Sequence, residues 1–196
     1  LHLCDRRQRQ MCIRDRFKSI LLQGKFILVE ILNVTYNIIP NPLRNFYLRC
    51  FGIEIGSASS IHRCCKFFHV GKLVIGKNSV VNFGCYLDNR RGISIGNNVG
   101  VAHNTKIYTL GHNLDSPQFE TKGAPVTIED DVFIFSNVMI MPGVTIGQGA
   151  IVLPGSVVTK DVPSRKIVGG NPARIIRNRI AEIDYKQSYN LSLIHI

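Results

Sequence analysis

The sequence predicts an all-β solenoid of about five triangular coils of parallel strands, with an N-terminal helical segment and a short C-terminal helix. Aliphatic residues recur every six positions at 128, 134, 140, 146, 152 and 158, and earlier at 95, 101 and 107. Four positions after each stands a small or β-branched residue, such as Val132 or Ser156. A period of six fits neither a helix nor an ordinary strand, whereas fixed periods are typical of repeat architectures.

The longer spacings predict the shape of one coil. Isoleucines at 55, 75 and 95 are twenty residues apart, and those at 128 and 146 are eighteen apart. Eighteen residues are three hexads, so each coil is a triangle with sides six residues long. The step from 95 to 128 is thirty-three residues, fifteen more than a coil of eighteen requires. We therefore assign 52–164 to the solenoid and expect a protruding loop over 112–126.

The cysteines fit the interior of this solenoid. Each inward aliphatic residue stacks about 4.8 Å from its counterpart in the next coil. Cys65 and Cys85 occupy the same small-residue corner position in adjacent coils, and we interpret them as interior fillers rather than metal ligands or nucleophiles. The chain has no C-x-x-C pair and no signal-peptide pattern. We expect reduced thiols and a cytoplasmic location.

The N-terminal helical segment is assigned to 17–51. Apolar residues over 17–39 follow helical spacing, and Pro40 and Pro42 end this first helix. Lys18, Lys25 and Glu30 argue against a helix that spans a membrane. Two interpretations stay open. The helix packs on the solenoid or a neighbouring subunit, or it rests on the inner face of a membrane as a peripheral contact.

The two ends differ in composition from the rest. Residues 1–16 carry five Arg and two Asp without an apolar period and resemble translated adapter sequence, so we expect a non-native tail. We expect a turn and short basic helix over 165–186 and a partly non-native tail over 187–196. The formal net charge of +11 favours an anionic partner. Because the charge is dispersed, we do not expect nucleic acid.

Three motifs carry a family resemblance: Ile146-Gly-x-Gly-Ala, Pro154-Gly-Ser-Val-Val-Thr-Lys-Asp-Val-Pro163 and Gly169-Gly-Asn-Pro-Ala-Arg174. With the hexads in register, they resemble the hexapeptide-repeat acyltransferases of the left-handed β-helix fold. The similarity is greatest to galactoside and maltose O-acetyltransferases and to sugar acetyltransferases of polysaccharide synthesis, and it covers about 52–180. It implies a left-handed coil and a homotrimer with sites between subunits.

The resemblance also implies a general base at His112, the first residue of the loop. An imidazole can take the proton of a sugar hydroxyl as its oxygen attacks a thioester, and such a base contributes about 10²–10⁴-fold. We expect direct transfer from acetyl-coenzyme A to a hydroxyl of a saccharide, without an acyl-enzyme and without a metal. One alternative is N-acetylation of an amino sugar on the same fold. Another is a non-catalytic β-helix assembly module.

The remaining site residues follow from the same resemblance. It places an acceptor contact at Asn82, while the acidic residue of the family falls at Arg90, so we expect Asp88 to substitute for it. Cations suit the phosphates of coenzyme A, and small residues would line its pantetheine channel. The implied coenzyme A contacts are Ser136, Pro154, Thr159, Lys160, Arg174 and Arg177.

Overall fold

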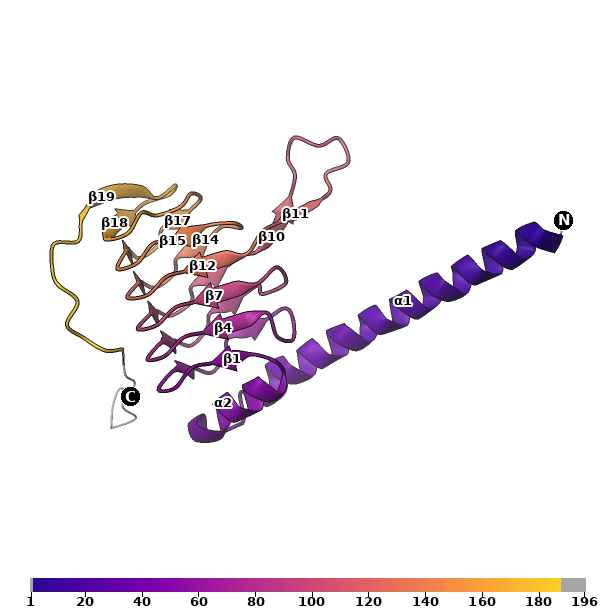
Figure 1. Cartoon of the computed structure of the whole chain (residues 1–196), viewed down its shortest axis with the longest axis horizontal. Helices are drawn as coiled ribbons and strands as arrows, with labels where there is room; N and C mark the ends of the chain where they lie inside the picture. Colours follow the sequence, from indigo (N-terminus) through magenta and orange to yellow (C-terminus); the bar gives the residue numbers. More distant parts are fainter. Residues whose placement is uncertain (1, 188–196) are drawn as a thin grey trace.

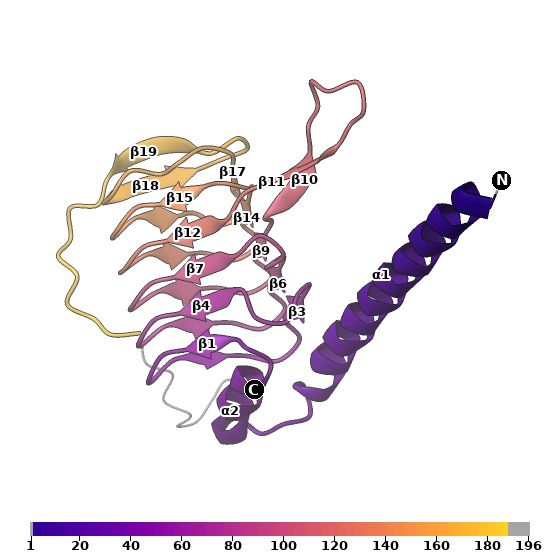
Figure 2. The same cartoon turned by 45° about the vertical axis from the view of Figure 1, so that its right-hand side comes forward.

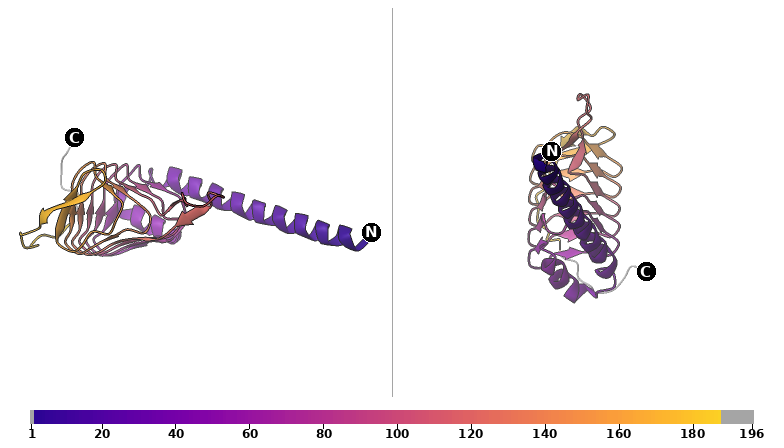
Figure 3. Two further views of the ribbon diagram at one scale, coloured as in Figure 1. Left: turned by 90° about the horizontal axis from the view of Figure 1, so that it is seen from above. Right: turned by 90° about the vertical axis from the view of Figure 1, so that its right-hand side faces the viewer.

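The computed structural model describes the backbone of residues 2–187, together with the side chains of residue 16 and of residues 18–187 except 41 and 42. Its body is a triangular solenoid, and a long helix and a two-stranded arm project from it (Figures 1 and 2). Seen from above, the coils lie over one another and the helix extends away from them (Figure 3).

Three sheets form the faces of the solenoid, which we call A, B and C. Face A contains β1 (Glu54–Ile55), β4 (Leu73–Ile75), β7 (Ile93–Ile95), β12 (Val126–Ile128) and β15 (Thr145–Ile146). Face B contains β2 (Ser60–Ile61), β5 (Val80–Val81), β8 (Gly100–Val101), β13 (Phe133–Ile134), β16 (Ile151–Val152), β18 (Lys166–Gly169) and β19 (Arg174–Asn178). Face C contains β3 (Lys66–Phe67), β6 (Tyr86–Leu87), β9 (Lys106–Ile107), β14 (Met139–Ile140) and β17 (Val157–Val158). The corners between the faces are the A/B, B/C and C/A edges.

The core is the stack of inward residues that the hexads predict. On face A, Ile55, Ile75, Ile95, Ile128 and Ile146 pair in parallel register from one coil to the next. All five are buried, as are the Cys65 and Cys85 thiols, which are free. No coil can bury its inner surface alone, so stacking supplies most of the stability. The five predicted coils are present, and β18 begins a sixth turn on face B.

The corners are tight enough to demand particular residues. Gly84, at the B/C edge, has a φ of +75°, a backbone conformation that glycine adopts far more readily than other residues. A Cβ at Gly84 would lie 2.3 Å from Oδ1 of Asn104 in the next coil. Asn104 itself has a positive φ of 59°, which asparagine tolerates better than most residues.

The insertion in the third coil forms an antiparallel arm of β10 (Leu110–His112) and β11 (Thr121–Gly123). The arm leaves the solenoid at the C/A edge, between β9 and β12, and projects on the same side as the long helix (Figures 1 and 2). Its base is fixed by Thr109, whose buried hydroxyl donates to the carbonyl of Asp88 at 2.6 Å.

Two helices, α1 (His2–Thr35) and α2 (Asn41–Cys50), close the first coil. An end coil exposes strand N–H and C=O groups that need partners. The Asn33 side chain bonds both the N–H and the carbonyl of Phe67 at 2.9 Å. Buried Arg44 donates to the carbonyl of Ile61 at 3.2 Å, and Arg49 donates to that of Ile55 at 2.6 Å. Each face of the first coil is therefore capped by a helix side chain.

The first helix differs from the expected one. It begins at His2, inside the segment for which we expected no element, and it ends at Thr35 rather than residue 39. Arg and Gln, which make up seven of residues 1–16, are good helix formers and extend the helix without an apolar pattern. Toward its C-terminal end, Val29, Leu32 and Tyr36 are buried, and the Tyr36 hydroxyl donates to the carbonyl of Cys65 at 2.7 Å.

Much of the apolar surface of α1 is uncovered. Within the described side chains, the large exposed hydrophobic residues of this helix are Ile20, Leu21, Leu22, Phe26, Ile27, Leu28, Ile31 and Val34. Among the residues that were searched, no helix has both the length and the apolar character needed to cross a membrane.

The prediction of a C-terminal helix within 165–186 is wrong. The segment instead forms β18 and the antiparallel strand β19, followed by an irregular stretch that runs back along the solenoid (Figure 1). The open edge of β18 needs a pairing partner, and the β-branched Ile175 and Ile176 suit a strand. Beyond it, buried Arg179 donates to the carbonyl of Gly149 at 3.1 Å, and the amide of Gln187 donates to Asn98 at 2.6 Å.

Candidate functional site

His112 lies at the end of β10, opposite Thr121, and is exposed. Its Nδ1 is 2.8 Å from the carbonyl oxygen of Phe119, and the two rings stack with centroids 4.5 Å apart and planes 5° apart. A carbonyl can only accept a hydrogen bond, so Nδ1 carries the proton. In the neutral imidazole, Nε2 then holds the free lone pair. The arm therefore presents one ring nitrogen that can accept a proton.

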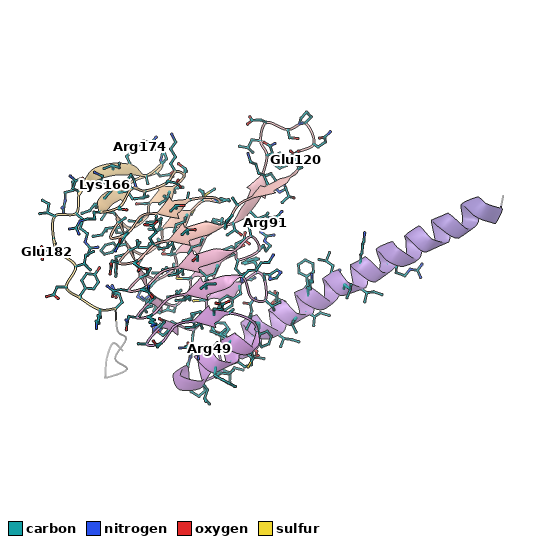
Figure 4. All side chains as sticks on the ribbon, viewed as in Figure 1. Arg49, Arg91, Glu120, Lys166, Arg174 and Glu182 are labelled. Atoms are coloured by element: carbon teal, nitrogen blue, oxygen red, sulfur yellow. The ribbon has the colours of Figure 1, made fainter. Side chains whose placement is uncertain are left out.

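The tip of the arm is braced around one carboxylate. Glu120 accepts hydrogen bonds from the Asn113 amide at 2.9 Å and from the Ser116 hydroxyl. The bond from Ser116, and next the bond from Asn113, lowers the pKa of Glu120, so the carboxylate stays ionised. The backbone amide of Asn113 also donates to the carbonyl of Glu120 at 2.9 Å. Figure 4 shows Glu120 on the arm, and its hydrogen bonds hold together the chain that follows His112.

Asp88 lies at the C/A edge below the arm, but its side chain is fully buried. Its two carboxylate oxygens accept hydrogen bonds from Nε and Nη2 of Arg90, at 2.7 and 2.9 Å. The Arg90 side chain is 44% exposed. Asp88, the expected substitute for the acidic residue of the family, is thus buried under its pair with Arg90, and Arg90 and Arg91 are charged residues that this edge exposes to solvent.

Asn82, Ser136 and Pro154 lie on the other side of face C, at the B/C edge. The half-buried Asn82 follows β5, and its backbone N–H donates to the carbonyl of Val101 at 2.9 Å. Ser136 and Pro154 occupy one corner position in coils four and five. The structure brings these three residues to one edge.

The same corner column contains an aromatic pair that we did not expect at the site. Phe83 and His103 stack with ring centroids 4.1 Å apart, and Phe83 is 50% exposed. The coil spacings of 20, 33 and 18 residues place Phe83 and His103 in register with Ser136 and Pro154. On face C beside this column lies a hollow of about 350 Å³, lined by Gly84, Asn104, Lys106, Asn137 and Met139.

The residues expected to bind phosphate lie at the C-terminal end of the solenoid. Thr159 and Lys160 follow β17 at the C/A edge and are exposed. Arg174 and Arg177 are exposed on β19, where they pair with Gly169 and Ile167. These partners are two residues apart on β18, because a bulge in the pairing adds one residue to β19. The two arginines therefore share a face, although they lie on a strand and not on the expected helix.

Within one chain the expected residues fall into separate groups. Asn82, Ser136 and Pro154 mark the B/C edge, whereas His112, Thr159 and Lys160 mark the C/A edge. The flat width of face C lies between them. The chain thus carries the expected site residues on two separate edges. In the searched part of the chain, no group of three His, Cys, Asp or Glu side chains could hold a metal ion.

Comparisons with known proteins agree with this architecture. Residues 125–160 match the family model described as bacterial transferase hexapeptide (six repeats). Galactoside O-acetyltransferase of Escherichia coli K12 is 36% identical over 126 residues, which are 63% of this chain and 62% of that protein. The chain thus spans about three fifths of the length of the first curated relatives that it matches.

Two solved structures extend over more of the fold. The hexapeptide-repeat acetyltransferase of Vibrio cholerae, in complex with acetyl-coenzyme A, is 33% identical with a TM-score of 0.71, over 78% of this chain and 86% of that one. A maltose O-acetyltransferase of Clostridium difficile is 32% identical with a TM-score of 0.75, over 81% and 88%. The solenoid has the left-handed β-helix fold of these acetyltransferases.

Proposed function

Because the chain belongs to the hexapeptide-repeat acetyltransferases, we propose that it transfers the acetyl group of acetyl-coenzyme A to a hydroxyl group of a saccharide. The observation that carries this proposal is the contact between Nδ1 of His112 and the Phe119 carbonyl, at 2.8 Å. It holds the imidazole in the tautomer that a general base requires, on an arm that projects from the solenoid.

In the proposed reaction, Nε2 of His112 takes the proton of the acceptor hydroxyl as its oxygen attacks the thioester carbon. The imidazolium then returns this proton to the sulfur as the C–S bond breaks, so an ester and a free thiol are formed. The net reaction needs no oxidant or reductant. A base placed in this way contributes about 10²–10⁴-fold.

The separation of the expected site residues between two edges supports a cyclic trimer. A head-to-tail ring joins two different surfaces of each subunit. If the B/C edge of one subunit meets the C/A edge of the next, Asn82 and Ser136 of the first approach His112 and Lys160 of the second. Face C then points toward the threefold axis. Three such contacts close the ring and produce three equivalent sites.

The residues at the C-terminal end of the solenoid have the charge that binding of coenzyme A requires. Lys160, Arg174 and Arg177 are exposed cations that can bind phosphate groups, and the two arginines share one face of β19. Ser136 and Pro154 offer little bulk along the B/C edge, where a thin chain would lie. In the related Vibrio cholerae structure, acetyl-coenzyme A is the bound molecule.

The test is release of free thiol from acetyl-coenzyme A in the presence of a panel of sugars, glycosides and amino sugars. We expect release with a hydroxyl acceptor and its loss in His112→Ala. Leu114→Ala is the matched control, because Leu114 lies on the same arm with 82% exposure and should leave the rate unchanged. Release with amino sugars alone would favour N-acetylation. No release with any acceptor would favour an assembly module.

A further inference from the structure

Arg90 is held in one orientation at the base of the arm. Its Nε and Nη2 bond the buried carboxylate of Asp88 at 2.7 and 2.9 Å, and its Cζ lies 5.6 Å from the centroid of the Phe68 ring. A two-point bond to a carboxylate combined with an aromatic contact restricts a guanidinium more than either alone. The Asp88 hydrogen bonds raise the pKa of Arg90, which therefore stays cationic.

The guanidinium keeps donors for another group. Arginine has five N–H donors, of which the Asp88 contact uses one on Nε and one on Nη2. Within the described part of the chain, Nη1 of Arg90 has no hydrogen-bond partner. Because the side chain is 44% exposed, these donors are open to a ligand. A fixed donor group with an open edge binds an anion without first losing side-chain freedom.

Three further cations surround Arg90, and we call the four of them the arm-base cations. Lys66 Nζ lies 5.8 Å from the centroid of the same Phe68 ring, and Lys72 Nζ donates to the Arg90 carbonyl at 3.2 Å. Arg91 follows, with its amide N–H bonded to Thr109 Oγ1 at 3.0 Å, and lies beside the arm (Figure 4). Against these four charges, the same contacts include one carboxylate, that of Asp88, so the surface is positive.

This chemistry differs from what the family resemblance implies, because a carboxylate is expected where Arg90 stands. A carboxylate accepts hydrogen bonds from neutral hydroxyl groups, whereas a guanidinium only donates. Hydrogen bonds from a guanidinium to an anion are roughly twice as strong as hydrogen bonds between neutral partners. We propose that the saccharide acceptor carries an anionic group, a carboxylate or a phosphate, which Arg90 binds below the arm. This inference rests on the proposed function, since it names the acceptor class of that site.

The experiment compares three acceptors that share one ring and differ at C6: methyl β-glucuronide, methyl β-glucoside 6-phosphate and methyl β-glucoside. We expect kcat/KM to be at least tenfold higher for one of the anionic acceptors than for the neutral one, a difference of about 1.4 kcal/mol. The better of the two anions distinguishes carboxylate from phosphate. Equal use of all three, or preference for methyl β-glucoside, would overturn the proposal.

The variants test whether Arg90 is the cause. Arg90→Gln alone leaves a buried, unpaired Asp88 charge, which is strongly destabilising. The double variant Asp88→Asn/Arg90→Gln removes both charges and should fold. We expect it to lose the preference for the anion while the KM for acetyl-coenzyme A stays the same. Lys77→Gln, which removes one positive charge at the exposed A/B edge as Arg90→Gln does at the C/A edge, is the control and should keep the preference. A double variant that retains the preference would contradict the assignment.

A binding measurement separates this inference from the proposed function. Saturation-transfer NMR with the same three glycosides, in the absence of acetyl-coenzyme A, reports binding whether or not turnover occurs. Selective binding of an anion without thiol release would retain the Arg90 site and reject the transferase. Thiol release without any preference for an anion, in binding or in turnover, would reject the Arg90 site and retain the transferase.

Discussion

Two inactive variants should restore each other if the site is shared between subunits. His112→Ala damages only the C/A edge, and Asn82→Ala damages only the B/C edge. In the proposed ring, each site takes one edge from each of two neighbouring subunits. A trimer that contains both variants in a two-to-one ratio has three ordered contacts, of which one joins two intact edges. Co-expression with different tags and purification over both tags selects these trimers. We expect about one third of wild-type activity in them.

The control for this prediction pairs two lesions on the same edge. His112→Ala mixed with Lys160→Ala gives trimers in which no C/A edge is intact, so activity should not exceed the mean of the two variants. Thiol release is measured at acetyl-coenzyme A concentrations below saturation, where both lesions reduce the rate. A mixture of His112→Ala and Asn82→Ala that shows no gain would mean that both residues act within one subunit. A gain in the Lys160 mixture would contradict the division into edges.

Three further outcomes follow from the site and the cap. His112→Ala should lower kcat at least about a hundredfold with acetyl-coenzyme A binding nearly intact by calorimetry, and retention of half the rate would reject the base. Lys160→Ala and Arg174→Ala should each raise the KM for acetyl-coenzyme A about tenfold or more, because a hydrogen bond to a charged group contributes about 1.5–3 kcal/mol, whereas the acceptor KM should change little. Deletion of 1–16 should leave the melting temperature unchanged, whereas deletion of 1–39 removes the cap of the first coil. The longer deletion should lower stability or solubility, or abolish liposome flotation if α1 rests on membranes. A fully stable trimer without 1–39 that never bound liposomes would contradict both roles of the helix.

The solenoid was predictable because each hexad is a local signal. An aliphatic residue and a small residue at fixed spacing specify one side of a coil, and twenty-residue spacings specify how coils stack. The position of the arm was predictable for the same reason, since it interrupts the period between Ile95 and Ile128. The antiparallel pairing of β10 with β11 was not predicted and appears only in the structure.

The two ends were less predictable because their structure depends on what they pack against. Ile175 and Ile176 join a strand because β18 has an open edge, which no local pattern reveals. The apolar pattern of the sequence places Asn33 and Tyr36 in an amphipathic helix. Their hydrogen bonds to the first coil show that they also cap it. Tertiary pairing overrides local propensity at both ends of the solenoid.

The site was predictable as a set of positions but not as an arrangement. Sequence register placed Asn82, Asp88 and His112 in neighbouring coils, yet it could not show that Asp88 is buried and pairs with Arg90. Nor could it show that the Phe119 carbonyl fixes the tautomer of His112. Both features depend on side-chain direction at a corner, where the chain leaves the regular repeat.

The geometry of the solenoid explains why the site should need an arm and a second subunit. The faces are flat ladders, so a single coil stack provides strips rather than deep pockets. From Asn82 in the second coil to Pro154 in the fifth, the B/C edge rises three rungs, or about 14 Å. Such a strip suits an elongated molecule that lies along the solenoid but leaves one side open to water. The C/A edge of a neighbour would cover that side, and its arm would bring His112 across the strip. Exclusion of water and supply of the base would then depend on the same contact between subunits.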